Sequence, residues 1–110
     1  MTHLTEQEKK ALALFKARAV RSLPDHTATI QLFGSKARGD AQKHSDLDVL
    51  VIVADGTWHD RIRLSEISAH VMGETNVLIS PKLFTRQQWQ TMKQERAMFW
   101  QTIKHDLVDV

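Results

Sequence analysis

The stretch that decides the fold is FGSKARGDAQKHSDLDVLVIV, which runs from Phe33 to Val53. It joins a Gly-Ser pair, a short basic segment and two aspartates that open an otherwise apolar run. The apolar run, residues 48–54, is rich in β-branched residues, which is typical of a strand covered on both faces. We therefore expect a central strand whose first residues carry two like charges.

Helices and strands are expected to alternate on either side of this strand. A threonine stands three residues before a glutamate or glutamine at Thr5 and at Thr85, and each pair precedes apolar residues at helical intervals. The pattern predicts, in chain order, a helix from Thr5 to before Pro24, a strand 28–33, a short helix 36–38, a strand 48–54, a helix 57–72 ended by Gly73, a strand 75–80 stopped by Pro81, and a long C-terminal helix after Thr85. This order predicts an α/β (α+β) fold with a small mixed sheet of three to four strands and helices packed against it.

Length and composition narrow the class of protein. The 110 residues predict a single domain spanning residues 1–110. Without cysteine the chain has no disulfide framework, no thiolate metal site and no cysteine nucleophile. The net charge of +2 is too small to favour nucleic-acid binding by bulk electrostatics, so we expect none. Charges interrupt the N-terminal helix and no apolar run reaches the length of a membrane span, which predicts a soluble, cytoplasmic protein.

The aspartate pair is the strongest sign of chemistry. Side chains two positions apart on a strand point to the same side, so Asp46 and Asp48 would present their carboxylates together, about 7 Å apart at the backbone. Such a pair is unfavourable alone, because each charge raises the pKa of the other. Mg²⁺ prefers oxygen ligands and commonly uses one or two carboxylates plus substrate phosphates. The alternative is structural: Asp46 caps the turn before the strand and Asp48 pairs with a basic neighbour.

The residues upstream complement a metal–phosphate site. Gly34 lets the backbone approach an anion closely, and Ser35 at a helix start offers a hydroxyl and an amide. Lys36 and Arg38 add positive charge, and Arg38 would fall on nearly the same helical face as Ser35. In the alternative reading this segment is a solvated turn with Arg38 paired to Asp40, and for Lys36 we favour that reading.

Taken together, these residues resemble a known signature. Gly34-Ser35, ten further residues and then Asp46-Leu47-Asp48 are similar to the signature of the nucleotidyltransferase superfamily that includes DNA polymerase β, and the whole stretch resembles the minimal nucleotidyltransferase (MNT) proteins. The resemblance covers about residues 28–110 in element order. It implies that Asp46 and Asp48 hold Mg²⁺, with two ions as an option, that Gly34 and Ser35 hold the terminal phosphates of ATP, and that Arg38 offsets their charge.

The chain departs from the resemblance at one position. The family normally adds a third carboxylate on the next strand, as a metal ligand that also helps to deprotonate the attacking hydroxyl. We align that position with Asn76, whose neutral amide ligates weakly and is no base. Glu74 is the alternative, although a loop position beside Gly73 suits it better. The resemblance therefore implies that transfer is slow or absent while nucleotide binding survives.

The resemblance also implies a partner. MNT proteins of this size resemble the antitoxins of toxin–antitoxin pairs whose toxin is an all-helical HEPN ribonuclease, and some transfer AMP from ATP to a tyrosine of the toxin. The sequence-based hypothesis is thus an MNT antitoxin with Mg²⁺-dependent adenylyltransferase activity. Two alternatives stay open: an antitoxin that acts by binding alone, with a site decayed at Asn76, and a transferase acting on a small molecule.

Overall fold

The computed structural model describes residues 4–23, 28–39, 46–56 and 58–110. The elements in these residues are, in chain order, α1 (Glu6–Ser22), β1 (Thr29–Phe33), α2 (Ser35–Arg38), β2 (Leu47–Val53), α3 (Trp58–Thr75), β3 (Ile79–Thr85), α4 (Arg86–Gln94), α5 (Met98–Ile103) and β4 (Val108–Asp109).

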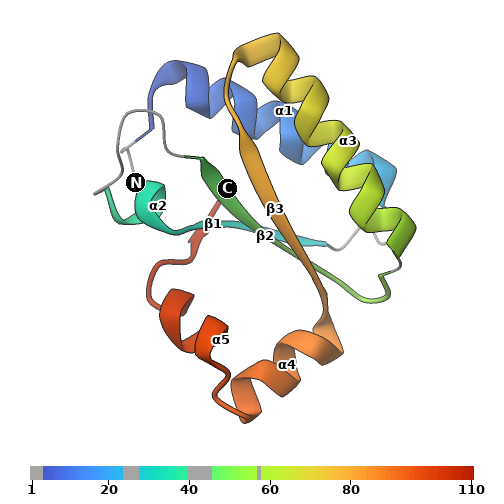
Figure 1. The fold of residues 1–110 in the computed structure, drawn as a ribbon, viewed down its shortest axis with the longest axis vertical. Helices are drawn as coiled ribbons and strands as arrows, with labels where there is room; N and C mark the ends of the chain where they lie inside the picture. Colours follow the sequence, from blue (N-terminus) through green and yellow to red (C-terminus); the bar gives the residue numbers. More distant parts are fainter. Residues whose placement is uncertain (1–3, 24–27, 40–45, 57) are drawn as a thin grey trace.

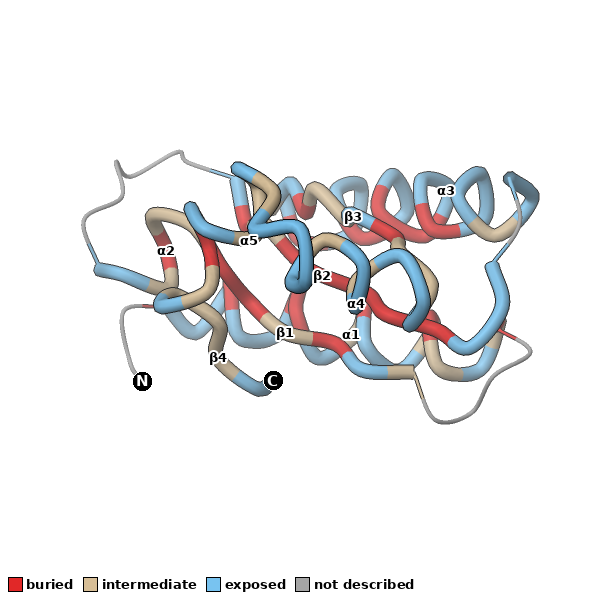
Figure 2. The backbone as a smooth tube through the Cα atoms, turned by 90° about the horizontal axis from the view of Figure 1, so that it is seen from below, coloured by how far each residue is buried: buried red, intermediate tan, exposed pale blue. Residues whose placement is uncertain are grey.

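The strands form one mixed sheet in the order β3-β2-β1-β4. β1 runs antiparallel to β2 and to β4, whereas β3 runs parallel to β2. β2 therefore lies inside the sheet, as its unbroken apolar run predicts, and its side chains are buried almost throughout (Figure 2). The predicted mixed α/β fold with a sheet of three to four strands is confirmed.

Each face of the sheet has its own apolar layer. α1 and α3 lie side by side over one face, where they pack on alternate residues of β2 such as Val49 and Val51 (Figure 1). The other face carries a smaller cluster in which Phe33, Leu50 and Ile52 pack with aromatic residues of α4 and α5. Because residues of a strand alternate between faces, Asp48 falls on the α5 face with Leu50 and Ile52. The aspartates thus lie at the end of the smaller apolar layer.

Several sequence-based predictions are confirmed in detail. Both capping boxes form: Thr5 with Glu8 opens α1, and Thr85 with Gln88 opens α4. In each box the threonine hydroxyl accepts from the third backbone N–H of the helix, and the Glu or Gln oxygen accepts from the threonine N–H. The expected strands 28–33 and 48–54 correspond to β1 and β2 within one residue.

The predicted strand 75–80 is wrong in its bounds. α3 does not end at Gly73 but continues to Thr75, whose hydroxyl bonds to the Val71 carbonyl, and β3 begins only at Ile79. β3 then passes through Pro81 instead of stopping there. This is tolerated because β3 is an edge strand of the described sheet, where a residue without an N–H can face away from the ladder.

The predicted long C-terminal helix is also wrong. The helical pattern is split into α4 and α5, since Arg96 takes a left-handed backbone with a φ of 54° between them. The chain after α5 returns to the sheet and pairs β4 with β1, so that Leu32 lies opposite Val108. This return brings the C-terminal segment next to α2. Within the described residues, no helix is long and apolar enough to cross a membrane.

The prediction that Lys36 lies in a solvated turn is also wrong. Its ammonium lies 2.7 Å from Glu8 Oε2, and both side chains are about a tenth exposed or less. Burial raises the pKa of Glu8, but the hydrogen bonds from Lys36 and Thr5 outweigh it, so the pKa is lowered overall. One carboxylate therefore caps α1 and anchors α2, which fixes the segment after Gly34.

We expect Lys36→Met to lower the free energy of unfolding by about 3 kcal/mol, because it leaves the Glu8 carboxylate buried without its partner. Urea unfolding at pH 7 measures the change. The control is Lys9→Met, which removes the exposed 3.2 Å ion pair with Glu6 and should cost less than about 0.5 kcal/mol. Since the folded pKa of Glu8 lies below its ordinary 4.5, the contribution of the pair should be present above that pH and lost as the pH falls. Equal losses in the two variants would contradict the assignment.

Candidate active site

The structure brings Asp46 and Asp48 together at the start of β2. Asp48 lies opposite Phe33 of β1 on one side and opposite Ser80 of β3 on the other. The Ser80 hydroxyl donates a hydrogen bond of 3.1 Å to Asp46 Oδ2, so both carboxylates lie on the sheet face that carries Ser80. Asp46 is exposed and Asp48 half-buried, which leaves the pair open to a ligand from solvent.

The charged form of Asp48 is disfavoured within the pair, as the spacing of the two aspartates in the sequence predicts. Burial first, and then the charge of Asp46, raise the pKa of Asp48 above its ordinary value. The charges of Lys82 and Arg38 act in the opposite direction without cancelling this rise. A cation bound between the two carboxylates would relieve both causes at once.

The Gly34–Ser35 turn lies directly against this carboxylate. A Cβ built on Gly34 would come within 2.5 Å of Asp48 Oδ2, and the backbone of Gly34 has a φ of +80°, which favours glycine. Ser35 is the first residue of α2 and is partly exposed. The tight turn therefore places the start of α2 beside the aspartate pair, as the signature predicts.

Arg38 is close enough to act on Asp48 but is held by another residue. Its guanidinium donates a hydrogen bond of 2.9 Å to Asp106, on the segment that follows α5. The Asp106 side chain is only 12% exposed, whereas that of Arg38 is 45% exposed. The ion pair with Asp106 therefore restrains an arginine whose charge acts on Asp48. The alternative partner, Asp40, lies outside the described residues.

The predicted third position, Asn76, is not part of β3. It follows the last residue of α3, with a φ of 60° and its N–H bonded to the Met72 carbonyl. Glu74, the alternative, forms an ion pair of 2.8 Å with Arg18 of α1. The β3 residue opposite Asp48 is Ser80, and the next residue on that face is Lys82. The strand next to the aspartates therefore offers a hydroxyl and an ammonium where the resemblance implies a carboxylate.

The donor set fits Mg²⁺ completed by a substrate. Two carboxylates and a neighbouring hydroxyl supply only oxygen, which is the chemistry that a hard divalent cation prefers. Among the described residues, no three Asp, Glu or His side chains are placed to hold a metal by themselves. Mg²⁺ commonly takes its remaining ligands from water and substrate phosphates, so two aspartates suffice to begin such a site.

Comparison with known proteins agrees with this geometry. A family profile described as "Nucleotidyltransferase domain" matches residues 16–100. The chain belongs to the nucleotidyltransferase domain family. It is also 33% identical over 73 residues to a "putative protein adenylyltransferase" of Methanocaldococcus jannaschii, a match that covers 66% of this chain and 74% of that relative. No solved structure matched the chain.

Membership in this family supports a transferase. The matched residues, 16–100, include every site residue named above except Asp106. The nucleotidyltransferase fold accounts for the strand that carries the aspartates between a Gly-Ser turn and a parallel neighbour. The family resemblance implies a carboxylate on this parallel neighbour, where the chain has Ser80 and Lys82 instead.

Sequence reasoning missed Ser80, Lys82 and Asp106. Ser80 lies within the predicted strand 75–80, but the sequence-based prediction places the third position at Asn76, and Lys82 lies beyond the predicted end of that strand at Pro81. The signal that could have found them is the alternation of Ile79 and Leu83 with polar residues across the proline, which has the period of a strand covered on one face. Asp106 carries no local signal, since its contact with Arg38 depends on the return of the chain after α5.

We expect Gly34→Ala to destabilise this nucleotidyltransferase domain by about 1 to 3 kcal/mol, because a Cβ would meet Asp48 Oδ2 and the backbone is left-handed. Gly73→Ala is the matched control: its Cβ meets nothing within 4 Å and the position is helical, so stability should rise by up to about 1 kcal/mol. Chemical denaturation measures both changes. A Gly34→Ala protein as stable as the control would contradict the close approach.

We expect Asp48→Asn to stabilise the metal-free protein, raising its melting temperature by about 3 °C. The folded pKa of Asp48 lies above its unfolded value, so the charged form opposes folding at neutral pH and a neutral amide removes that cost. For the same reason the metal-free wild type should gain stability from this group as the pH falls toward its pKa. Thermal melts with a metal chelator test this, and a lower melting temperature for Asp48→Asn would contradict it.

Proposed function

We propose that this protein is an MNT antitoxin that transfers AMP from ATP to a tyrosine hydroxyl of a cognate HEPN ribonuclease toxin and thereby neutralises it. The observation that carries the proposal is the placement of Asp46 and Asp48 on one sheet face, directly against the Gly34–Ser35 turn. Membership in the nucleotidyltransferase family supports the transfer of a nucleotide. The name of the Methanocaldococcus jannaschii relative supports an adenylyl donor and a protein acceptor.

Each residue has a role in the proposed reaction. Asp46 and Asp48 hold one or two Mg²⁺ ions, and Gly34 and Ser35 bind the terminal phosphates of ATP. Arg38, restrained by its ion pair with Asp106, offsets the charge of the triphosphate. When bound, Mg²⁺ neutralises charge that develops on the phosphate oxygens and orients the reacting groups.

The transfer is a single displacement at phosphorus. The tyrosine oxygen attacks the α-phosphorus of ATP, and a new oxygen–phosphorus bond forms. The bond from the α-phosphorus to the bridging oxygen breaks, and pyrophosphate leaves with the electron pair. The hydroxyl proton passes to water, because β3 carries Ser80 and Lys82 beside Asp48 instead of a carboxylate. We expect transfer to be slow for this reason.

The same departure favours a second candidate function, neutralisation of the toxin by binding alone. In that case the site would bind Mg²⁺ and ATP without measurable transfer, because no residue of β3 can accept the proton of the acceptor. The two candidates share the antitoxin role and differ only in whether label moves from ATP to the partner. A small-molecule acceptor would give neither label on the partner nor silencing of it.

The test uses α-labelled ATP, Mg²⁺ and the protein encoded by the adjacent gene. We expect label on that partner, and at least about a 100-fold loss in Asp46→Asn and in Asp48→Asn, because each removes a metal ligand. Label retained by either variant would contradict the roles of the aspartates. No label with wild type, but silencing of the partner, would leave the binding antitoxin in place of the transferase.

A gain-of-function variant locates the missing carboxylate. Ser80 lies opposite Asp48, so Ser80→Asp should place a third carboxylate at the pair and raise the transfer rate. Asn76→Asp is the matched control, since Asn76 lies outside β3 and the same substitution there should leave the rate unchanged. Faster transfer in Asn76→Asp than in Ser80→Asp would restore the sequence-based alignment and contradict the structural one.

A further inference from the structure

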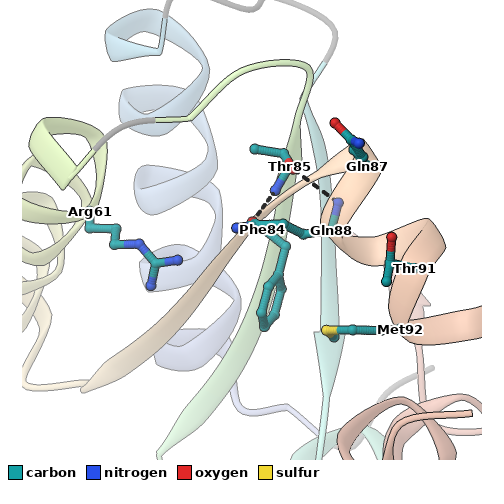
Figure 3. A pocket seen from close by; sticks show the side chains of 7 residues that line it. All are labelled: Arg61, Phe84, Thr85, Gln87, Gln88, Thr91 and Met92. Carbon is teal, nitrogen blue, oxygen red and sulfur yellow. Dashed lines mark hydrogen bonds between the residues drawn. The ribbon is translucent and has the colours of Figure 1, made fainter. Parts of the chain in front are cut away.

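A groove follows the free edge of β3 from Pro81 to the middle of α4. It consists of three adjoining cavities of about 570, 230 and 180 Å³, and Arg61 of α3 lines all three. Figure 3 shows the largest one, with Arg61 on one side and residues of α4 on the other. Phe84 and Met92 give it an apolar floor, and Gln87 and Thr91 are among its polar residues. We call this feature the β3-edge groove.

The charged side chains that the described residues contribute to the β3-edge groove are all positive. Among the described residues that line it, the charged side chains are Arg61 and Lys82, and none is acidic. The sequence from Ile79 to Gln94, which forms one wall, contains three cationic residues and no acidic one. Within the described residues, Arg61 makes no ion pair. The groove therefore favours an anionic ligand.

The groove shares one lining residue, Lys82, with the surroundings of the aspartate pair. Lys82 also lies on the sheet face of Asp48, where its positive charge partly offsets the rise in the pKa of Asp48 that burial and Asp46 cause. Ser80 lies opposite Asp48, and Phe84 lies four residues further along β3. At about 3.3 Å per residue, a ligand running along the strand covers about 13 Å from the aspartates to the largest cavity. An extended peptide covers that distance with about four residues.

The groove binds side chains better than it binds a further strand. The Leu78 carbonyl faces β2, where it accepts from Leu47, so by alternation Pro81, Leu83 and Thr85 turn their backbone groups toward the groove. Pro81 has no N–H, and the N–H of Thr85 is already bonded to Gln88 at 2.9 Å. Strand addition at this edge would thus lack the donors of Pro81 and Thr85, which disfavours a second copy of the chain as the occupant.

We propose that the β3-edge groove binds an acidic segment of the acceptor protein, with carboxylates two to five residues away from the hydroxyl that receives the nucleotide. The carboxylates lie against Arg61 and Lys82, and apolar side chains of the segment lie on Phe84 and Met92. This spacing keeps the acidic groups clear of Asp46 and Asp48, which would repel them. The proposal deepens the proposed function and rests on it for the identity of the hydroxyl.

A nucleic acid fits the β3-edge groove less well than an acidic peptide does. Tight nucleic-acid binding depends on neutralising many phosphates at once, commonly six to ten. Two cations line the described part of the groove, and the net charge of the chain is only +2. Two charges and an apolar floor suit a short peptide with a few carboxylates.

The test measures binding without the reaction. A fluorescein-labelled peptide with one tyrosine and a run of glutamates two to five residues from it is titrated with Asp46→Asn/Asp48→Asn protein, without ATP, and anisotropy is recorded. We expect binding that weakens with salt and that falls about tenfold in Arg61→Gln/Lys82→Gln added to this background. The matched control is Arg63→Gln/Lys93→Gln, which removes the same charges from the helices α3 and α4 outside the groove and should leave affinity unchanged.

Four results would overturn the proposal. They are no binding of the glutamate peptide, equal binding of its glutamine counterpart, an equal loss in the control variant, and tighter binding of an oligouridine of matched length. Because the assay contains no ATP, peptide binding without label transfer would contradict the proposed function alone, whereas transfer to the partner without groove binding would contradict this proposal alone. In the transfer assay, Arg61→Gln should raise the KM of the glutamate peptide and leave kcat unchanged.

Discussion

The structure depends on the pairing of β2 with a strand on each side. Antiparallel β1 brings Gly34 against Asp48, and parallel β3 places Ser80 opposite Asp48, where the Ser80 hydroxyl donates to Asp46. Since β2 is buried almost throughout, a one-residue slip in its register would turn Asp48 into the layer under α1 and α3. The apolar side chains of β2 therefore fix the position of the charged pair, and the fold tolerates two like charges only where the strand reaches solvent.

The parts around this pair are supported from distant segments of the chain. Glu8, which caps α1, also binds Lys36 and so holds α2 beside the aspartates. Asp106, beyond α5, forms an ion pair with Arg38 at the end of α2. The site therefore combines a local signature with two ion pairs that link it to both ends of the described chain. The two ion pairs therefore hold α2 and Arg38 in place around the aspartate pair.

The sequence predicted those parts of the site that lie within one continuous stretch. Gly34, Ser35, Asp46 and Asp48 belong to a turn and a strand whose apolar pattern and glycine are local features, and the structure brings them together. The predictions failed where long-range pairing decides the outcome. The bounds of β3 depend on an edge position that lets Pro81 remain in a strand, and the break at Arg96 reflects the packing of α4 and α5 on the sheet. Lys36 looked solvated because its partner, Glu8, is far away in sequence.

We propose that the Asp46–Asp48 pair binds a metal–nucleotide complex. Calorimetric titration with a non-hydrolysable ATP analogue, in Mg²⁺ and in metal chelator, tests it most directly. We expect binding only with Mg²⁺, and loss of that binding in Asp48→Asn although this variant is well folded. Binding of equal strength in the chelator, or unchanged binding by Asp48→Asn, would contradict the claim and assign the pair a structural role.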